Sequence, residues 1–122
     1  MFPPFILAKL YVKGSLKNTA TGFELSIQNT LAPGTIMGLA PLKVDGVEYP
    51  LAQTKVLLSS GKALTTGDVS AKSPLRFNVG DRVTIQVEGQ PLPAGLHKII
   101  ISPKTKEAGT LVIPAEDTIQ PS

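Results

Sequence analysis

The most regular segment of the chain is GDRVTIQVEG, residues 80–89. Within it Val83, Ile85 and Val87 alternate with polar side chains, and a glycine stands at each end. Successive side chains of a β-strand point to opposite faces of its sheet, so this two-residue period predicts a strand with one buried face. Such a strand needs partners, and similar short segments occur on both sides of it.

Two segments near the N-terminus show the same alternation. Apolar residues or glycine occupy every second position over residues 9–17 and again over 23–28. The residues between them, 18–22, favour a turn, so we expect the two segments to pair as an antiparallel hairpin. Lysines four apart in the first segment would also align on a helix, but Gly14 and the β-favouring Tyr11 disfavour that alternative.

Further strands are predicted at short apolar segments bounded by turn-forming residues. They cover residues 35–44, 47–49, 51–58, 96–102 and 109–113. The first two meet at Asp45-Gly46, a dipeptide that supplies the positive φ of a tight hairpin turn. The segment 51–58 also fits a helix, and we favour a strand. Residues 59–74 are rich in Ser, Thr, Gly and Lys and predict a loop with one helical turn at 66–69.

Composition bounds the class of protein. The chain has 122 residues, of which 42% are hydrophobic and 17% charged, with 11 glycines and 11 prolines. These values fit one folded, turn-rich domain rather than a disordered or long-helix protein. Because the chain has no cysteine, disulfides and thiolate metal sites are excluded. We find neither a signal peptide nor an apolar run long enough for a membrane helix, and we expect a cytoplasmic, soluble protein.

About eight short strands separated by turns predict an all-β fold, a single-domain antiparallel β-sandwich over residues 1–122. A parallel sheet would require crossover helices, which no segment offers convincingly. We expect an apolar N-terminal arm at residues 1–6 and a polar tail at residues 115–122. The arm contains Phe2, Phe5 and Ile6, which would either pack on their own domain or dock into a partner subunit.

The single histidine, His97, is the best individual candidate for a functional side chain. Its neighbours at a two-residue spacing are Ile99 and Ile101, so it shares a strand face with apolar residues. A hydrogen-bonded histidine at the edge of the core is the favoured interpretation, and a role at a ligand or partner surface is the alternative. With no cysteine and one histidine, neither a nucleophilic triad nor a metal site is indicated, so we assign no metal to this chain.

A basic face is the second candidate. Lys9, Lys13 and Lys17 surround Tyr11 on the segment 9–17. Lysines with an aromatic residue are typical of a single-strand nucleic-acid binder, but lysines also protect exposed sheet edges, and we favour the edge interpretation. The net charge of +3 is too small to indicate a polyanionic partner, so nucleic acid ranks below a protein partner.

From residue 42 to residue 102 the chain resembles the small β subunit of the C-glycoside deglycosidases. The shared features are Val44-Asp45-Gly46 with Pro50, a strand around Val56, residues 77–80 before the strand Val83-Ile85-Val87, and Leu92 with Gly95-Leu96-His97. The resemblance implies a β-sandwich subunit packed against a larger barrel subunit that holds a divalent metal and carries the main chemistry. It also implies that His97 and the strands around it correspond in position, without a catalytic role assigned to them.

Three functions follow as hypotheses. The first is a non-catalytic accessory or assembly subunit that binds a protein partner or copies of itself through its N-terminus and one sheet face. The second is a small-molecule-binding domain, or a stand-alone lyase or hydrolase, with His97 as its best candidate residue. The third is a nucleic-acid binder that uses Lys9, Lys13 and Lys17. The first is favoured, and whether the chain has catalytic activity of its own stays open.

Overall fold

A computed structural model describes residues 2–121, and within them thirteen short strands form three antiparallel sheets. The five strands of the first sheet are, in spatial order, β1 (Lys17–Asn18), β2 (Gly22–Gln28), β9 (Arg82–Glu88), β6 (Thr54–Leu58) and β7 (Ala63–Thr65). The second sheet consists of β13 (Ile113–Ile119), β10 (Gly95–Ile101), β4 (Leu42–Val44) and β5 (Val47–Tyr49). The third sheet consists of β12 (Gly109–Thr110), β11 (Pro103–Thr105), β3 (Gly34–Leu39) and β8 (Leu75–Phe77). The expected all-β antiparallel sandwich is therefore confirmed, with more and shorter strands than the eight expected.

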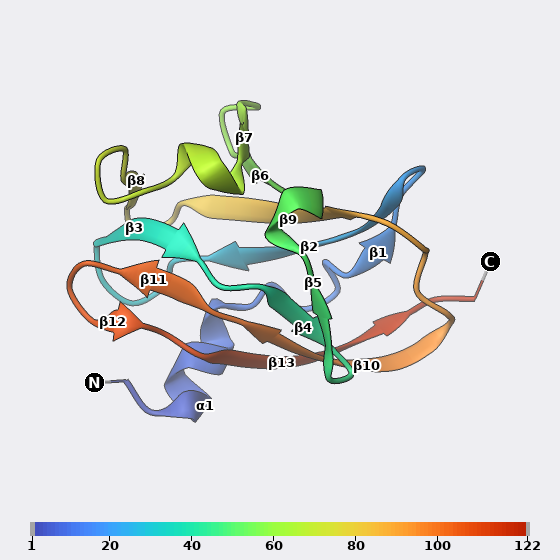
Figure 1. Cartoon of the computed structure of the whole chain (residues 1–122). Coiled ribbons are helices and arrows are strands. Elements are labelled where there is room, and N and C mark those ends of the chain that lie inside the picture. The colour runs from blue at the N-terminus through green and yellow to red at the C-terminus, as the bar shows by residue number, and fades with distance from the viewer. Residues whose placement is uncertain (1, 122) are drawn as a thin grey trace.

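The second and third sheets together form one bent layer that faces the first sheet (Figure 1). Strand β3 leads into β4, β10 into β11, and β12 into β13, each after a break of one or two residues. Two of the breaks contain or adjoin proline, at Pro41 and Pro103, and proline cannot donate the ladder hydrogen bond that an unbroken strand requires. Across the break, the Ala40 amide still donates to the Ser102 carbonyl oxygen at 2.9 Å.

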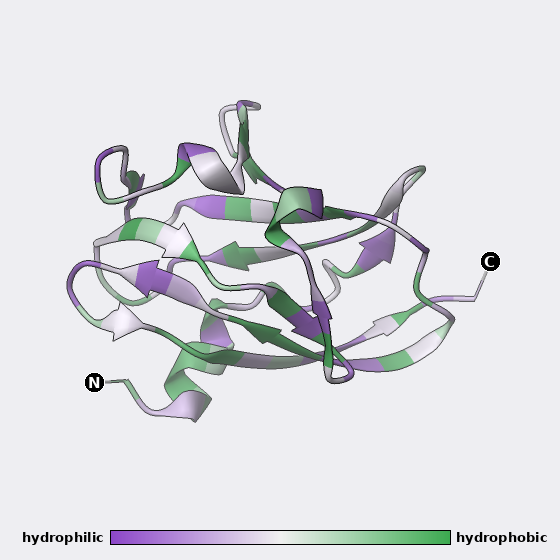
Figure 2. Ribbon diagram, in the orientation of Figure 1, coloured by the Kyte–Doolittle hydropathy of each residue, from purple (hydrophilic) through white to green (hydrophobic). Residues whose placement is uncertain are grey.

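The core lies between these two layers. Alternate residues of the strands point inward, and Figure 2 shows the resulting succession of hydrophobic and hydrophilic positions along the ribbons. Several inward side chains are at most 1% exposed: Phe23, Leu25, Leu42, Ile85, Ile99, Ile101 and Ile113. Full burial of such a side chain stabilises a fold by about 1.5–3 kcal/mol, so these positions account for much of the cohesion between the layers.

Close packing between β2 and β9 leaves no room for a side chain at position 22. Gly22 begins β2 opposite Glu88, and a Cβ atom built on Gly22 would lie 1.9 Å from the carbonyl oxygen of Val87. In the β4–β5 hairpin the predicted turn is confirmed, because Asp45 and Gly46 both have positive φ, 54° and 83°. Val44 and Val47 close that turn as opposite residues.

The N-terminal segment, residues 2–16, differs most from expectation. Instead of a strand over 9–17, it forms helix α1 (Pro4–Leu7), a short 3₁₀ helix η1 (Ala8–Leu10) and a turn at Gly14. Proline stands in the first turn of α1, a position that tolerates its missing N–H group, and apolar residues three apart bury one side of the segment. The expected pairing with β2 survives in β1 and in a single bridge between Tyr11 and Ile27.

This N-terminal segment closes the side of the sandwich between the two layers. The Val12 amide donates to the Ser26 carbonyl oxygen of β2 at 3.0 Å, while α1 and η1 pack against β13. Figure 1 shows α1 beside β13, below the bent layer. Leu7, Leu10 and Leu16 are at most 5% exposed, so this part of the segment belongs to the core. Residues 2–5, which lie in the expected apolar arm, are exposed.

Two other expectations need correction. Residues 115–119 do not form a polar tail, because β13 continues to Ile119 and its side chains alternate between buried and exposed. The adjacent acidic residues made this strand hard to predict, since a buried carboxylate is compatible with a strand only when hydrogen bonds compensate it.

The segment 51–58 begins with a 3₁₀ helix η2 (Leu51–Gln53) before β6, so the helix and the strand interpretations of it were each partly right. The expected helical turn in the loop corresponds to η3 (Thr66–Asp68), preceded by the short strand β7.

Candidate functional site

An apolar pocket opens at one end of the sandwich, where the turn after β2 meets the β11–β12 hairpin. Its volume is about 140 Å³ and its walls are almost entirely carbon. Lining side chains come from the N-terminal segment (Phe2, Leu10), from β2 and the turn after it (Ile27, Leu31), and from later strands (Phe77, Ile113). A pocket of this size matches one aromatic or branched aliphatic group, because cavities near 150 Å³ accept molecules the size of benzene.

The wall of the pocket depends on Asn29, which follows β2. Its Nδ2 donates to the carbonyl oxygens of Ala32 and Phe77 at 2.8 and 2.7 Å, and its Oδ1 accepts from the Leu31 amide at 3.1 Å. The side chain is 4% exposed, so these bonds replace the water that a buried amide would otherwise lack. Asn29 therefore shapes the turn, and neither hydrogen of its Nδ2 is left to bind a molecule in the pocket.

Phe2 and Phe5 add exposed apolar surface to the N-terminal segment. Phe2 lines the pocket and is 38% exposed, and Phe5 on α1 is 68% exposed. Ile6 is half-buried. Of the four side chains expected at a partner surface, the three N-terminal ones are therefore at least partly accessible, whereas His97 is 5% exposed and lies elsewhere.

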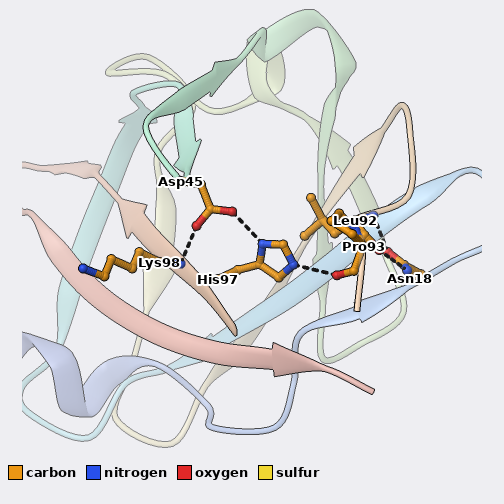
Figure 3. A network of polar contacts seen from close by, with 6 residues as sticks. All are labelled: Asn18, Asp45, Leu92, Pro93, His97 and Lys98. Carbon is orange, nitrogen blue, oxygen red and sulfur yellow. Dashed lines mark hydrogen bonds and ion pairs between the residues drawn. The ribbon is translucent and has the colours of Figure 1, made fainter. Parts of the chain in front are cut away.

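His97 sits at the other end of β10 from the pocket, held between two loops (Figure 3). Its Nδ1 lies 2.6 Å from Oδ2 of Asp45 in the β4–β5 turn, and its Nε2 lies 2.7 Å from the carbonyl oxygen of Pro93. The other oxygen of Asp45, Oδ1, accepts from the Lys98 amide at 2.9 Å. The loop that carries Pro93 is also anchored at Leu92, whose amide and carbonyl group both bond to the Asn18 side chain at 2.8 and 2.9 Å.

These contacts shift the pKa of His97 and the pKa of Asp45 in opposite directions. The Pro93 carbonyl raises the pKa of His97 above its ordinary value, burial opposes that increase, and Asp45 adds to it. The Lys98 amide and then His97 lower the pKa of Asp45. The expected sharing of one strand face by His97, Ile99 and Ile101 is confirmed by their common burial. The geometry agrees with the favoured interpretation of a hydrogen-bonded histidine at the core edge.

A second buried polar group, Asp117 on β13, was missed at the sequence level. Its Oδ2 accepts from the Tyr11 hydroxyl at 2.6 Å, the Gly14 amide at 2.8 Å and the Leu16 amide at 3.3 Å. Burial tends to raise the pKa of Asp117, but the Tyr11 hydroxyl and the backbone amides together lower it below its ordinary value. Burial and the bond to Asp117 raise the pKa of Tyr11. The period-two position of residue 117 relative to Ile113 and Ile119 is the signal that could have identified it.

The basic face is only partly present. Lys9, Lys13 and Lys17 are exposed, but Tyr11 is 9% exposed and its hydroxyl is bonded to Asp117. A buried ring cannot stack on a nucleic-acid base, so the aromatic element of that hypothesis is lost. Lys17 instead lies 3.8 Å from Glu24 on the neighbouring strand.

Three further findings concern metal ligands, membranes and buried polar atoms. Within residues 2–121, no group of three His, Asp or Glu side chains converges as metal ligands would. In the same part of the chain, the helices are too short or too polar to cross a bilayer. Each side-chain nitrogen or oxygen that is fully buried among the described residues has a hydrogen-bond partner.

Together these features define a small all-β domain with an apolar pocket at one end and the hydrogen-bonded, buried side chains of His97 and Asp117 at the other. The family described as hydroxymethylglutaryl-CoA reductase, N-terminal domain, has a model that matches residues 6–120. The chain belongs to that family. Comparison with curated proteins found none that matches it.

The resemblance to the small subunit of the C-glycoside deglycosidases is therefore wrong. The matched family covers residues 6–120, which include the whole region 42–102 on which the resemblance was based. The features quoted for it, such as Asp45-Gly46 and Pro50, are those that any tight hairpin followed by a strand end would select. They describe local β geometry and do not distinguish one sandwich family from another. The barrel partner with a divalent metal was implied by that resemblance alone and has lost its basis.

Proposed function

We propose that this chain is a non-catalytic assembly domain that docks onto a hydroxymethylglutaryl-CoA reductase polypeptide through its N-terminal segment and the adjoining apolar pocket. The observation that carries the proposal is the pocket itself, an apolar recess of about 140 Å³ that is lined in part by Phe2. Phe5, three residues further along the same segment, adds a ring that is 68% exposed. Stable interfaces are built around apolar anchors seated in such recesses. The family to which the chain belongs is named as a domain of that reductase, which supports the choice of partner.

The polar side chains support a structural rather than a chemical role. His97 and Asp117, the two buried ionisable groups most suited to acid–base work, are each bonded to neighbouring loops or segments of the same chain. A catalytic acid or base must reach the substrate proton that it transfers. Bonds of 2.6–2.8 Å already occupy His97 and Asp117, so both act as fasteners in this proposal.

The alternatives remain predictions with less support. A small-molecule-binding domain or a stand-alone lyase or hydrolase would rely on His97, which is buried and engaged at both ring nitrogens. A nucleic-acid binder would rely on Lys9, Lys13 and Lys17, but Tyr11, the aromatic residue expected to act with them, is buried. Self-association through the same apolar surface is a further possible outcome, and the binding experiment separates it from the proposal.

The test is a binding titration of the purified chain with a hydroxymethylglutaryl-CoA reductase catalytic polypeptide from the same organism, followed by analytical ultracentrifugation. We expect a complex of defined stoichiometry, and Phe5→Glu should weaken it at least about tenfold, because it places a charge in an apolar interface. Leu96→Glu is the matched control. Leu96 is 60% exposed, comparable to Phe5, but stands at the start of β10, away from the pocket.

The proposal fails if the two proteins do not associate at about 100 μM, or if Leu96→Glu weakens the complex as much as Phe5→Glu does. Association of the chain with itself that excludes the reductase would replace the proposal by a homo-oligomer. Circular dichroism of each variant checks that the sandwich is intact, which is expected because both substituted side chains are exposed.

A further inference from the structure

The hydrogen bonds of His97 define its protonation state. Both ring nitrogens lie within 2.7 Å of an oxygen, Nδ1 at Oδ2 of Asp45 and Nε2 at the carbonyl oxygen of Pro93. A carbonyl oxygen only accepts, and an ionised carboxylate only accepts as well. The Asp45 side chain is 49% exposed and its Oδ1 accepts from the Lys98 amide, so it is an ordinary solvated carboxylate, ionised at neutral pH. Both nitrogens of His97 must therefore donate, and a ring with two N–H groups is an imidazolium cation.

The groups around this cation are few. Asp45 faces it from the β4–β5 turn, and Asp117 stands opposite it on β13. Asp117 is engaged by Tyr11 and by backbone amides of the N-terminal segment, and no bond joins it to the ring of His97. Lys98, the next residue on β10, has an exposed side chain and meets Asp45 through its backbone amide. The facing strands β2 and β9 present apolar residues to the interior.

We propose that His97 is a pH-sensitive clasp. While doubly protonated it joins the β4–β5 turn to the loop 89–94, and it releases that loop when it gives up a proton to solvent. The neutral ring keeps one N–H group. That group stays on Nδ1, because the charged carboxylate of Asp45 is the stronger acceptor. The lone pair on Nε2 then faces the lone pairs of the Pro93 carbonyl oxygen, and the contact at 2.7 Å becomes repulsive.

Opening is local because the loop has a second anchor. Asn18 bonds the amide and the carbonyl group of Leu92 at 2.8 and 2.9 Å, and neither bond involves a titrating group. Residues 93 and 94 can therefore move while Leu92, which is 8% exposed, stays in the core and Gly95 stays paired with Ile119 in β10. The moving part lies two residues before Leu96, an exposed apolar residue at the start of β10.

The test is imidazole and amide ¹⁵N NMR of the full chain between about pH 5 and about pH 9, a range that spans ordinary histidine titration. We expect both ring nitrogens of His97 to carry protons at pH 7, and the amide signals of residues 94–96 to shift with the midpoint of the ring. A single neutral tautomer at pH 7, or loop amides that do not follow the ring, would overturn the proposal.

Two variants on the same hairpin separate the clasp from general charge effects. Asp45→Asn retains the turn, because Asn-Gly also supports the positive φ values at these positions, but removes the charged acceptor. It should lower the ring midpoint by about one pH unit, a tenfold change in proton affinity. Glu48→Gln removes the same charge from an exposed residue of β5 and should leave the midpoint within about 0.2 unit. Equal shifts in both variants would contradict the proposal.

Discussion

His97 and Asp117 stand directly opposite each other on β10 and β13, yet each is bonded to a different part of the chain. His97 holds the β4–β5 turn and the loop 89–94, whereas Asp117 holds the N-terminal segment. Burying two polar residues in one cross-strand pair costs free energy unless each side chain has its own hydrogen-bond partners. This one cross-strand pair therefore attaches three separate segments to the bent layer: the β4–β5 turn, the loop before β10 and the N-terminal segment.

Replacement of His97 by phenylalanine should lower the free energy of unfolding in a pH-dependent way. The folded-state pKa of His97 is raised, so its contribution is complete below its unfolded pKa of about 6.5 and is lost as the pH rises through the folded value. We expect a deficit of about 1–3 kcal/mol at pH 5.5 that shrinks at higher pH. Urea unfolding of both proteins measures it, and a deficit that stays constant up to pH 9 would exclude the charged state.

Tyr11→Phe should weaken the attachment of the N-terminal segment. The change removes the hydroxyl that donates to Asp117, and we expect a loss of about 1–2 kcal/mol at neutral pH. The pKa of Asp117 is lowered in the folded state, so its contribution is present above its unfolded pKa and is lost as the pH falls through the folded value. Without the Tyr11 donor that pKa rises, and acid unfolding should begin at a higher pH.

Tyr49→Phe is the control for this prediction. The Tyr49 ring packs edge-to-face against Phe23, with the centroids 5.1 Å apart, and its hydroxyl makes no hydrogen bond to the residues described. Its loss should change the stability by less than about 0.5 kcal/mol. If acid titration followed by circular dichroism gives the same onset for both variants, the bond from Tyr11 does not hold the segment.

Asn29→Ala should destabilise the turn after β2 that forms one wall of the pocket. The substitution leaves the Ala32 and Phe77 carbonyl oxygens and the Leu31 amide without their partner, and should cost about 1–3 kcal/mol. Asn78→Ala is the control, because Asn78 is exposed and engages Asp81 through its backbone amide. Thermal unfolding compares the two, and an equal loss in both would mean that the turn after β2 does not depend on the Asn29 side chain.

Gly22→Ala should be among the most damaging single changes in the first sheet. The new methyl group would lie 1.9 Å from the Val87 carbonyl oxygen, so β2 and β9 must separate locally, and we expect a loss of about 2 kcal/mol or more. At Gly38 the nearest atom to an added Cβ is Cδ of Lys104, at 3.6 Å, an ordinary contact. Gly38→Ala should therefore be nearly neutral in urea unfolding, and comparable losses at the two sites would refute the packing argument.

Much of this fold could be predicted where the side-chain period is two and the turns are local. Strand β9, strand β2 and the Asp45-Gly46 hairpin follow from residues that are neighbours in sequence. The N-terminal segment could not be predicted in this way. Its conformation depends on Asp117, 106 residues from Tyr11, and no local pattern contains that partner.

In the candidate site, too, local features could be predicted and contacts between distant residues could not. Alternation along β10 correctly predicted that His97 shares the buried face of Ile99 and Ile101. Its bonds to Asp45 and Pro93 required the loop and the turn to meet in space. The burial of Asp117 went unrecognised because Glu116-Asp117 has the composition of a solvated tail, whereas Tyr11 and backbone amides of the N-terminal segment supply the donors that make burial possible.

The bond between Tyr11 and Asp117 also orders events on the ribosome. The segment that contains Tyr11 cannot be fastened until residue 117 has been translated and has left the ribosome. Until then its leucines and phenylalanines stay uncovered, open to chaperones or to the wrong neighbour, and the nascent sandwich lacks one of its sides. Ribosome-stalled chains in which residue 117 is still inside the exit tunnel should therefore differ sharply in protease resistance at the N-terminal segment from chains in which it has emerged.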